Sequence, residues 1–122
     1  MAKFLHDNAL DGGVDYIVAN GERLVLTNGQ PANYAAVAAI ARADVSVDTL
    51  ITKANGDVSG RKAAIPARTG VNVDTTGTAD HCCLVDDTNS ILIAVTTFAS
   101  QSLTSGNTVD IGAWDIEFAD AT

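Results

Sequence analysis

The sequence predicts an α+β domain in which two N-terminal helices precede a mostly antiparallel β-sheet or β-sandwich. Three observations lead to this prediction. Apolar residues recur at helical spacing in the first forty residues, the period falls to two after Asp44, and turn motifs rich in Asn, Gly and Asp separate the later apolar runs. The length of 122 residues predicts one domain over residues 1–122.

The first helix is expected to begin at Asp7, a suitable N-cap, and to end at Asn20-Gly21. Its apolar stripe consists of Leu10, Val14, Ile17 and Val18. Acidic residues at four-residue intervals share another face, and we interpret this face as solvated rather than as a cation site: Asp7, Asp11 and Asp15.

A short strand and a second helix are expected next. The apolar run 23–27 ends at Asn28-Gly29, which is typical of a strand closing in a turn. The alanine-rich run from Tyr34 to Ala41 then predicts a helix, with Pro31 in its first turn.

The remaining chain predicts a series of strands. Pro66 predicts an edge position for the second of them, because proline lacks the amide proton that a central strand needs. The fourth and fifth are expected to pair as a hairpin across Asp86–Ser90. The expected strands are Val45–Thr52, Lys62–Ala67, Val71–Thr75, Ala79–Val85, Ile91–Phe98 and Thr108–Phe118.

The last of these strands changes its apolar phase near Gly112. The two phases are carried by Val109, Ile111 and Ala113, and then by Trp114, Ile116 and Phe118. A strand changes its buried face where it has an extra residue or crosses between sheets, so we expect a bulge or bend at Gly112. Trp114 is predicted to anchor the core or a subunit interface.

Charge and hydropathy limit the possible partners. The chain has 7 basic and 15 acidic residues and a formal net charge of −8. Nucleic-acid binding and polybasic membrane contact both depend on clustered Lys and Arg, so we expect neither. No secretory signal or membrane-spanning run is evident, which places the protein in the cytoplasm or in an assembly built there.

The two cysteines, Cys82 and Cys83, are neighbours in the sequence. Successive side chains of a strand point to opposite faces, so we expect two small apolar residues, one buried and one more exposed. The alternative is that one of them forms a disulfide with a neighbouring subunit. His81 precedes them, but no second ligand pair follows at zinc-site spacing, so no metal or cofactor is expected.

The sequence indicates no enzyme. Histidines occur only at positions 6 and 81, and His81 points away from Cys82 if both lie on one strand. The carboxylate pair Asp86-Asp87 falls in a predicted turn, where Asp commonly bonds its own backbone. The glycine-containing segment Gly56–Lys62 lacks phosphate-loop spacing and is expected to be a solvent loop.

The order of several segments resembles small virion proteins of tailed bacteriophages and prophages. The resemblance covers nearly the whole chain and rests on Phe4-Leu5-His6-Asp7, Leu10-Asp11, Asp15-Tyr16-Ile17, Pro31-Ala32-Asn33-Tyr34, Gly56-Asp57-Val58-Ser59-Gly60-Arg61-Lys62, Ala79-Asp80-His81, Leu84-Val85-Asp86, Leu103-Thr104-Ser105-Gly106-Asn107 and Trp114-Asp115-Ile116. It implies a non-enzymatic structural protein, foremost a capsid decoration or cement protein. These motifs are structural and transfer no functional residues.

The implied partners are the major capsid protein and copies of the chain itself, assembled as a symmetric oligomer, with a trimer favoured, in the virion. Residues 1–5 are the candidate for an extended N-terminal arm in such an assembly, and we expect Phe4, Leu5 and Trp114 to contribute to its interface. A tail or collar component, or a small carbohydrate-binding module on a tail tip, is the alternative. A carbohydrate site would need exposed aromatic rings, of which the chain has few.

Overall fold

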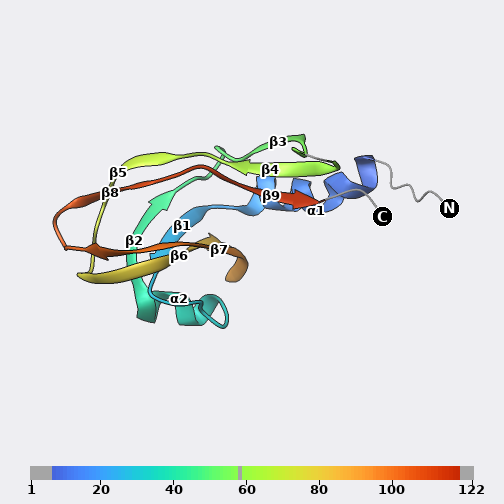
Figure 1. Cartoon of the computed structure of the whole chain (residues 1–122). Coiled ribbons are helices and arrows are strands. Elements are labelled where there is room, and N and C mark those ends of the chain that lie inside the picture. The colour runs from blue at the N-terminus through green and yellow to red at the C-terminus, as the bar shows by residue number, and fades with distance from the viewer. Residues whose placement is uncertain (1–6, 58, 119–122) are drawn as a thin grey trace.

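The computed structural model describes residues 7–57 and 59–118 and contains two helices and nine strands in this part of the chain (Figure 1). Antiparallel pairing joins the strands into three sheets, with orders β2-β1-β6-β7, β3-β4-β9 and β5-β8. The fold is therefore mostly antiparallel β with two short helices. The elements are α1 (Asp7–Asn20), β1 (Arg23–Thr27), α2 (Tyr34–Ile40), β2 (Ala41–Ser46), β3 (Thr52–Asn55), β4 (Arg61–Ile65), β5 (Arg68–Asn72), β6 (Gly77–Asp86), β7 (Ile91–Leu103), β8 (Thr108–Ile111) and β9 (Trp114–Phe118).

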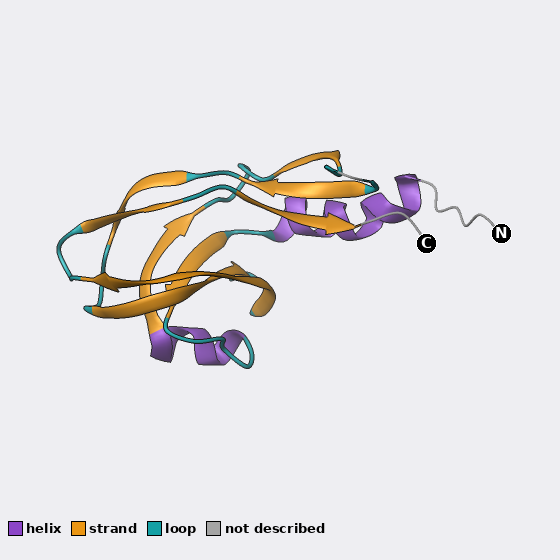
Figure 2. Ribbon diagram, viewed as in Figure 1, coloured by secondary structure: helices purple, strands orange, loops and turns teal. Residues whose placement is uncertain are grey.

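Two of the sheets are successive halves of one bent ribbon. Only two residues separate β4 from β5, and only two separate β8 from β9. The β5-β8 half lies over the four-stranded sheet, whereas the three-stranded half, with β3 added, lies against α1 (Figure 2). The predicted bend at Gly112 is confirmed, because the strand expected over 108–118 crosses there from one sheet to the other.

The four-stranded sheet buries both of its faces. The inner face carries Leu24, Leu26, Cys82 and Leu84 into the main core, together with Val14 and Ile17 of α1. The opposite face is covered by α2 and forms a smaller cluster of Val25, Val37, Cys83 and Val85. Alternation along β1 and β6 thus assigns each apolar residue to one of two cores.

Several local predictions are confirmed. Helix α1 ends at Asn20, and Gly21 suits the next position because a Cβ there would lie 2.9 Å from the Ile17 carbonyl oxygen, a backbone atom that cannot easily move. Helix α2 occupies the alanine-rich run, capped by Asn33, whose side chain accepts a hydrogen bond from the Ala36 amide at 3.0 Å. The hairpin of β6 and β7 also forms as expected.

Other predictions are corrected by the sheet pairing. Strand β1 lies between the two helices in sequence, so the helices do not both precede the sheet. The segment 45–52 is not one strand, because residues 47–51 form a turn whose Val47 and Ile51 are buried. Strand β4 is central between β3 and β9, not an edge, since it ends at Ile65 before Pro66 and keeps all its amide protons.

The predicted solvated acidic face is corrected in part, because Asp15 is exposed but Asp11 is largely buried by ion pairs; the Asp7 side chain lies outside the described residues. The Asp11 carboxylate pairs with Arg61 at 2.7 Å and with Lys53 at 3.4 Å, and Asp15 pairs with Lys53 at 2.9 Å. The hydrogen bond from Arg61, more than any other contact, lowers the pKa of Asp11. This face therefore attaches α1 to β3 and β4 through ion pairs.

Candidate functional site

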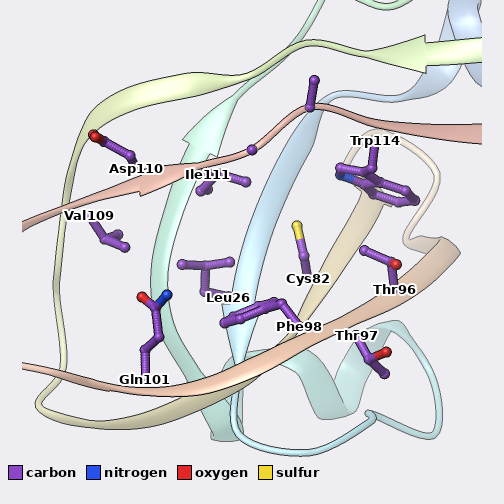
Figure 3. A pocket seen from close by; sticks show the side chains of 12 residues that line it. Leu26, Cys82, Thr96, Thr97, Phe98, Gln101, Val109, Asp110, Ile111 and Trp114 are labelled. Atoms are coloured by element: carbon purple, nitrogen blue, oxygen red, sulfur yellow. The ribbon is translucent and has the colours of Figure 1, made fainter.

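A groove lies between two free strand edges of the described residues. Strand β7 ends the four-stranded sheet, and β8 and β9 end the two sheets of the ribbon. Figure 3 shows β7 on one side of this groove and the strand running from β8 to β9 on the other. The other long side of the fold is closed by contacts between β2 and β5 and by a bridge between Ala43 of β2 and Val73, the residue that follows β5.

The interior of the groove is apolar. Leu26 and Cys82 form its base, and its volume is about 260 Å³. Phe98 projects into it from β7, opposite Ile111 and Trp114 (Figure 3). Such a space binds an apolar side chain by removing both surfaces from water.

The rim of the groove is polar. It includes the half-buried Thr96 and the exposed Gln101 from β7, and the exposed Asp110 from β8. Asp110 accepts a hydrogen bond from the Gly70 amide at 2.9 Å, so its carboxylate is turned toward β5 rather than into the groove. Asp110 is the one charged residue among those that line the groove, and no charged side chain points into its interior.

Trp114, predicted to be a core or interface anchor, lies half-buried at one end of the groove and packs against the main core. Its Nε1 atom is buried and has no hydrogen-bond partner among the described residues. The Cys82 thiol lines the same groove, but no hydrogen bond joins it to the indole N–H. A buried donor without an acceptor costs about 1–3 kcal/mol, so this position is a weak point of the core.

Replacing this tryptophan by phenylalanine is expected to leave the free energy of unfolding unchanged or to raise it by up to about 1 kcal/mol. Trp114→Phe removes the unpaired N–H and keeps most of the ring. Tyr34→Phe is the matched control, since its hydroxyl donates to Asp87 Oδ1 at 2.8 Å and its loss should cost about 1 kcal/mol. Urea unfolding measures both values, and a loss above about 1 kcal/mol for Trp114→Phe would show that the indole N–H has a partner.

Both cysteines are buried, with exposed fractions of 2% for Cys82 and 0% for Cys83. They point to opposite faces of the sheet as predicted, but the expectation that one of them is more exposed is wrong. Burial raises the pKa of Cys82 to about 12, and it also raises the pKa of Cys83. An intersubunit disulfide at either position would require the sheet to open first.

We therefore expect neither thiol to react with Ellman's reagent in the folded chain at neutral pH. The thiolate is the reactive form, and burial suppresses both its formation and its contact with the reagent. Two equivalents should react after unfolding in guanidinium chloride, because the chain has two cysteines. Rapid reaction of one equivalent under native conditions would contradict the burial and restore the possibility of an exposed subunit-contact thiol.

The remaining candidate residues have structural partners. The His81 Nδ1 atom lies 2.6 Å from Asp80 Oδ1, and His81 points to the face opposite Cys82, so it does not act on that thiol. The Asp86 carboxylate accepts hydrogen bonds from the Asn89 amide and side chain, at 3.2 and 2.7 Å, as expected for a turn. Asp87 instead binds Arg23.

The segment Gly56–Lys62 forms the connection into β4 and the start of that strand, and Lys62 pairs with Asp57 at 2.8 Å and Asp115 at 3.0 Å. The predicted interface residues Phe4 and Leu5 lie outside the described residues. No group of three or more His, Cys, Asp or Glu side chains gathers as a metal site within 7–57 and 59–118. Of the two described helices, neither is long and apolar enough to cross a membrane.

Sequence reasoning missed the groove, although one signal for it was present. The thirteen residues of β7 include no Asp, Glu, Lys, Arg or Pro. Edge strands usually carry such residues, which discourage pairing with other chains. The lack of charged residues and proline points to a binding edge only if β7 lies at the edge of its sheet. The sequence of β7 alone does not show its position in the sheet.

Comparison of the chain with protein-family models, with curated proteins and with solved structures finds no match.

Proposed function

We propose that this chain is a non-enzymatic structural protein of a bacteriophage virion, of the capsid decoration type. In this role it binds the outer capsid lattice as a symmetric homo-oligomer, with a trimer favoured. The sequence resemblance to phage virion proteins is the source of the assignment to a virion. One structural observation supports an assembly role: the long, uncharged edge of β7 beside an apolar groove.

An unprotected strand edge favours association with another chain. A free strand edge presents unpaired amide and carbonyl groups that readily pair with another chain. Proteins that work alone usually protect such an edge with charges, proline, bulges or a covering segment. Strand β7 has no charge and no proline, although its pairing with β6 is interrupted by irregularities between Ala79 and His81 and between Leu84 and Val85. An edge of this kind suits a protein whose working state is an assembly. The net charge of −8 keeps the unassembled chain soluble and away from packaged DNA.

The apolar lining supports a protein partner better than a carbohydrate. Sugar rings stack on exposed aromatic faces and need polar groups around them. Here Phe98 and Trp114 are half-buried and pack against the core, and Asp110 is turned away. The carbohydrate-binding alternative therefore gains no support from the groove.

The test is the copy number of this chain in purified particles of the phage or induced prophage that encodes it. Quantitative mass spectrometry against the major capsid protein gives this number directly. Hundreds of copies, near stoichiometric with capsid subunits, are expected for decoration. A tail-tube count, or a dozen copies or fewer, would instead indicate a tail or collar component. Absence from the particles would overturn the virion proposal.

A further inference from the structure

We propose that the groove between β7 and β8–β9 binds the segment Met1–Leu5 of a second copy of the chain. The segment adds to the edge of β7 as a strand and inserts Phe4 among Phe98, Val109 and Trp114. This proposal rests on the proposed function, because that function includes association of the chain with copies of itself.

The geometry of the groove suits an extended peptide. The free edge of β7 offers backbone donors and acceptors, which give affinity in strand addition. The apolar space beside that edge accepts a side chain from every second residue of an added strand. Backbone pairing and side-chain insertion thus occur at the same place (Figure 3).

Residues outside the described part supply a suitable occupant. Phe4 and Leu5 are adjacent large apolar residues, whereas residues 119–122 are Ala, Asp, Ala and Thr. Lys3 gives the segment a positive charge, opposite in sign to the net charge of −8 of the whole chain. The apolar side chains of the segment complement the apolar interior of the groove.

The chain's own segment is too far from its own groove. A Cβ at Gly13 would lie 2.5 Å from the Phe118 ring, so the middle of α1 contacts the end of β9. Trp114 lies at the other end of β9, and α1 continues from Gly13 to Asp7 in the opposite direction (Figure 1). Helix and strand rises put Asp7 more than about 20 Å from Trp114.

Three residues of extended chain reach only about 10 Å, so Phe4 does not reach the groove from Asp7 of the same copy. A segment from one copy that enters the groove of the next makes a head-to-tail contact. Contacts of this type form closed rings when the rotation between copies closes, and a trimer is one such ring. In such a trimer, each groove binds the Met1–Leu5 segment of the neighbouring copy.

The first experiment compares the oligomeric mass of three full-length chains by light scattering coupled to size exclusion. Wild type is expected to associate, and Phe4→Asp should raise the dissociation constant roughly 30-fold or more, because an aromatic anchor is lost. Leu50→Asp is the matched control. Its side chain is 43% exposed, does not line the groove, and should leave association unchanged.

Tryptophan fluorescence locates the contact. Trp114 is the only tryptophan in the chain, so its emission reports on the groove. The emission maximum should shift to the blue with rising concentration in wild type and in Leu50→Asp, but not in Phe4→Asp. Association that leaves the emission unchanged would place the contact elsewhere and overturn the inference.

A mixing experiment tests the exchange itself. Thr96→Lys puts a charge at the groove and should abolish self-association while the segment stays intact; Gly112→Leu, whose Cβ meets nothing within 4 Å, serves if the first variant does not fold. Neither this variant nor Phe4→Asp should associate alone, but a mixture should form a heterodimer, since one intact segment meets one intact groove. Failure to form it, or wild-type association of Phe4→Asp, would refute segment exchange.

These outcomes are separable from those of the proposed function. Segment exchange is measured on the purified chain in solution, and virion incorporation is measured on particles. A chain that is abundant in particles but whose association does not depend on Phe4 would keep the proposed function and reject the inference. A chain that exchanges segments in solution but is absent from particles would keep the segment exchange and reject the virion role.

Discussion

Leu84→Ala is expected to lower the free energy of unfolding by about 3–4 kcal/mol. Leu84 is fully buried on the inner face of β6 and pairs in register with Leu24 of β1. A Cβ added at Gly21 would lie 3.3 Å from Leu84 Cδ1, so this side chain also packs where α1 joins β1. Truncation would leave a cavity at the junction of the helix and the sheet, which the surrounding strands cannot easily fill.

Urea unfolding followed by circular dichroism measures this loss. Ile91→Ala is the matched control, because Ile91 belongs to the same hairpin but is 40% exposed. We expect it to cost no more than about 1 kcal/mol. A loss below about 1.5 kcal/mol for Leu84→Ala would contradict a tightly packed core at this position.

Arg23→Met is expected to lower the free energy of unfolding by about 1–2 kcal/mol at neutral pH. The guanidinium donates to both carboxylate oxygens of Asp87, each at 3.0 Å, and to Asp44 Oδ2 at 2.6 Å. It thereby joins β1 to β2 and to the turn of the β6-β7 hairpin. The expected loss in the free energy of unfolding is smaller than for a buried ion-pair network. Each of the three side chains is about one-third exposed, so solvent partly screens their charges.

The same variant should change the acid dependence of stability. Burial alone would raise the pKa of Asp87, but hydrogen bonds from Arg23 and Tyr34 outweigh it and lower this pKa. Because the pKa is lower in the folded state than the unfolded value of about 3.9, the stabilisation is complete above about pH 5. It is lost as the pH falls through the folded-state pKa, since protonation removes the charge that Arg23 binds.

Urea unfolding between pH 7 and pH 2 checks this behaviour. The difference between wild type and Arg23→Met should shrink as the pH falls below about 4. Arg42→Met is the control, because the guanidinium of Arg42 has no carboxylate partner among the described residues and donates an exposed hydrogen bond to the Thr78 carbonyl, at 3.3 Å. A difference that stays constant down to pH 2 would mean that the ion pair with Asp87 does not carry the effect.

Local sequence signals predicted the features that depend on near neighbours. The local sequence predicts the C-terminal end of α1, the short helix at Tyr34, the hairpin across Asp86–Ser90 and the bend at Gly112. Each depends on a cap, a turn or a change of period within a few residues. Residues this close meet in nearly any fold of the chain, so the sequence alone determines them.

The sheet assignments were decided only by the tertiary structure. Strand β4 became central because β9, more than fifty residues later, pairs beside it, and Val47 and Ile51 are buried in a turn because α1 and the sheet cover them. The acidic face of α1 meets Arg61 and Lys53 for the same reason.

The groove also depends partly on local sequence and partly on long-range strand pairing. The uncharged run of β7 and the single tryptophan are properties of the sequence, and the resemblance to phage proteins suggested a role in assembly. That β7 and the strand from β8 to β9 face each other as free edges across an apolar groove depends on which strands pair, and periodicity does not encode strand partners. The sequence by itself determined the local elements and their apolar faces; long-range pairing decided which faces and edges remain open for a partner.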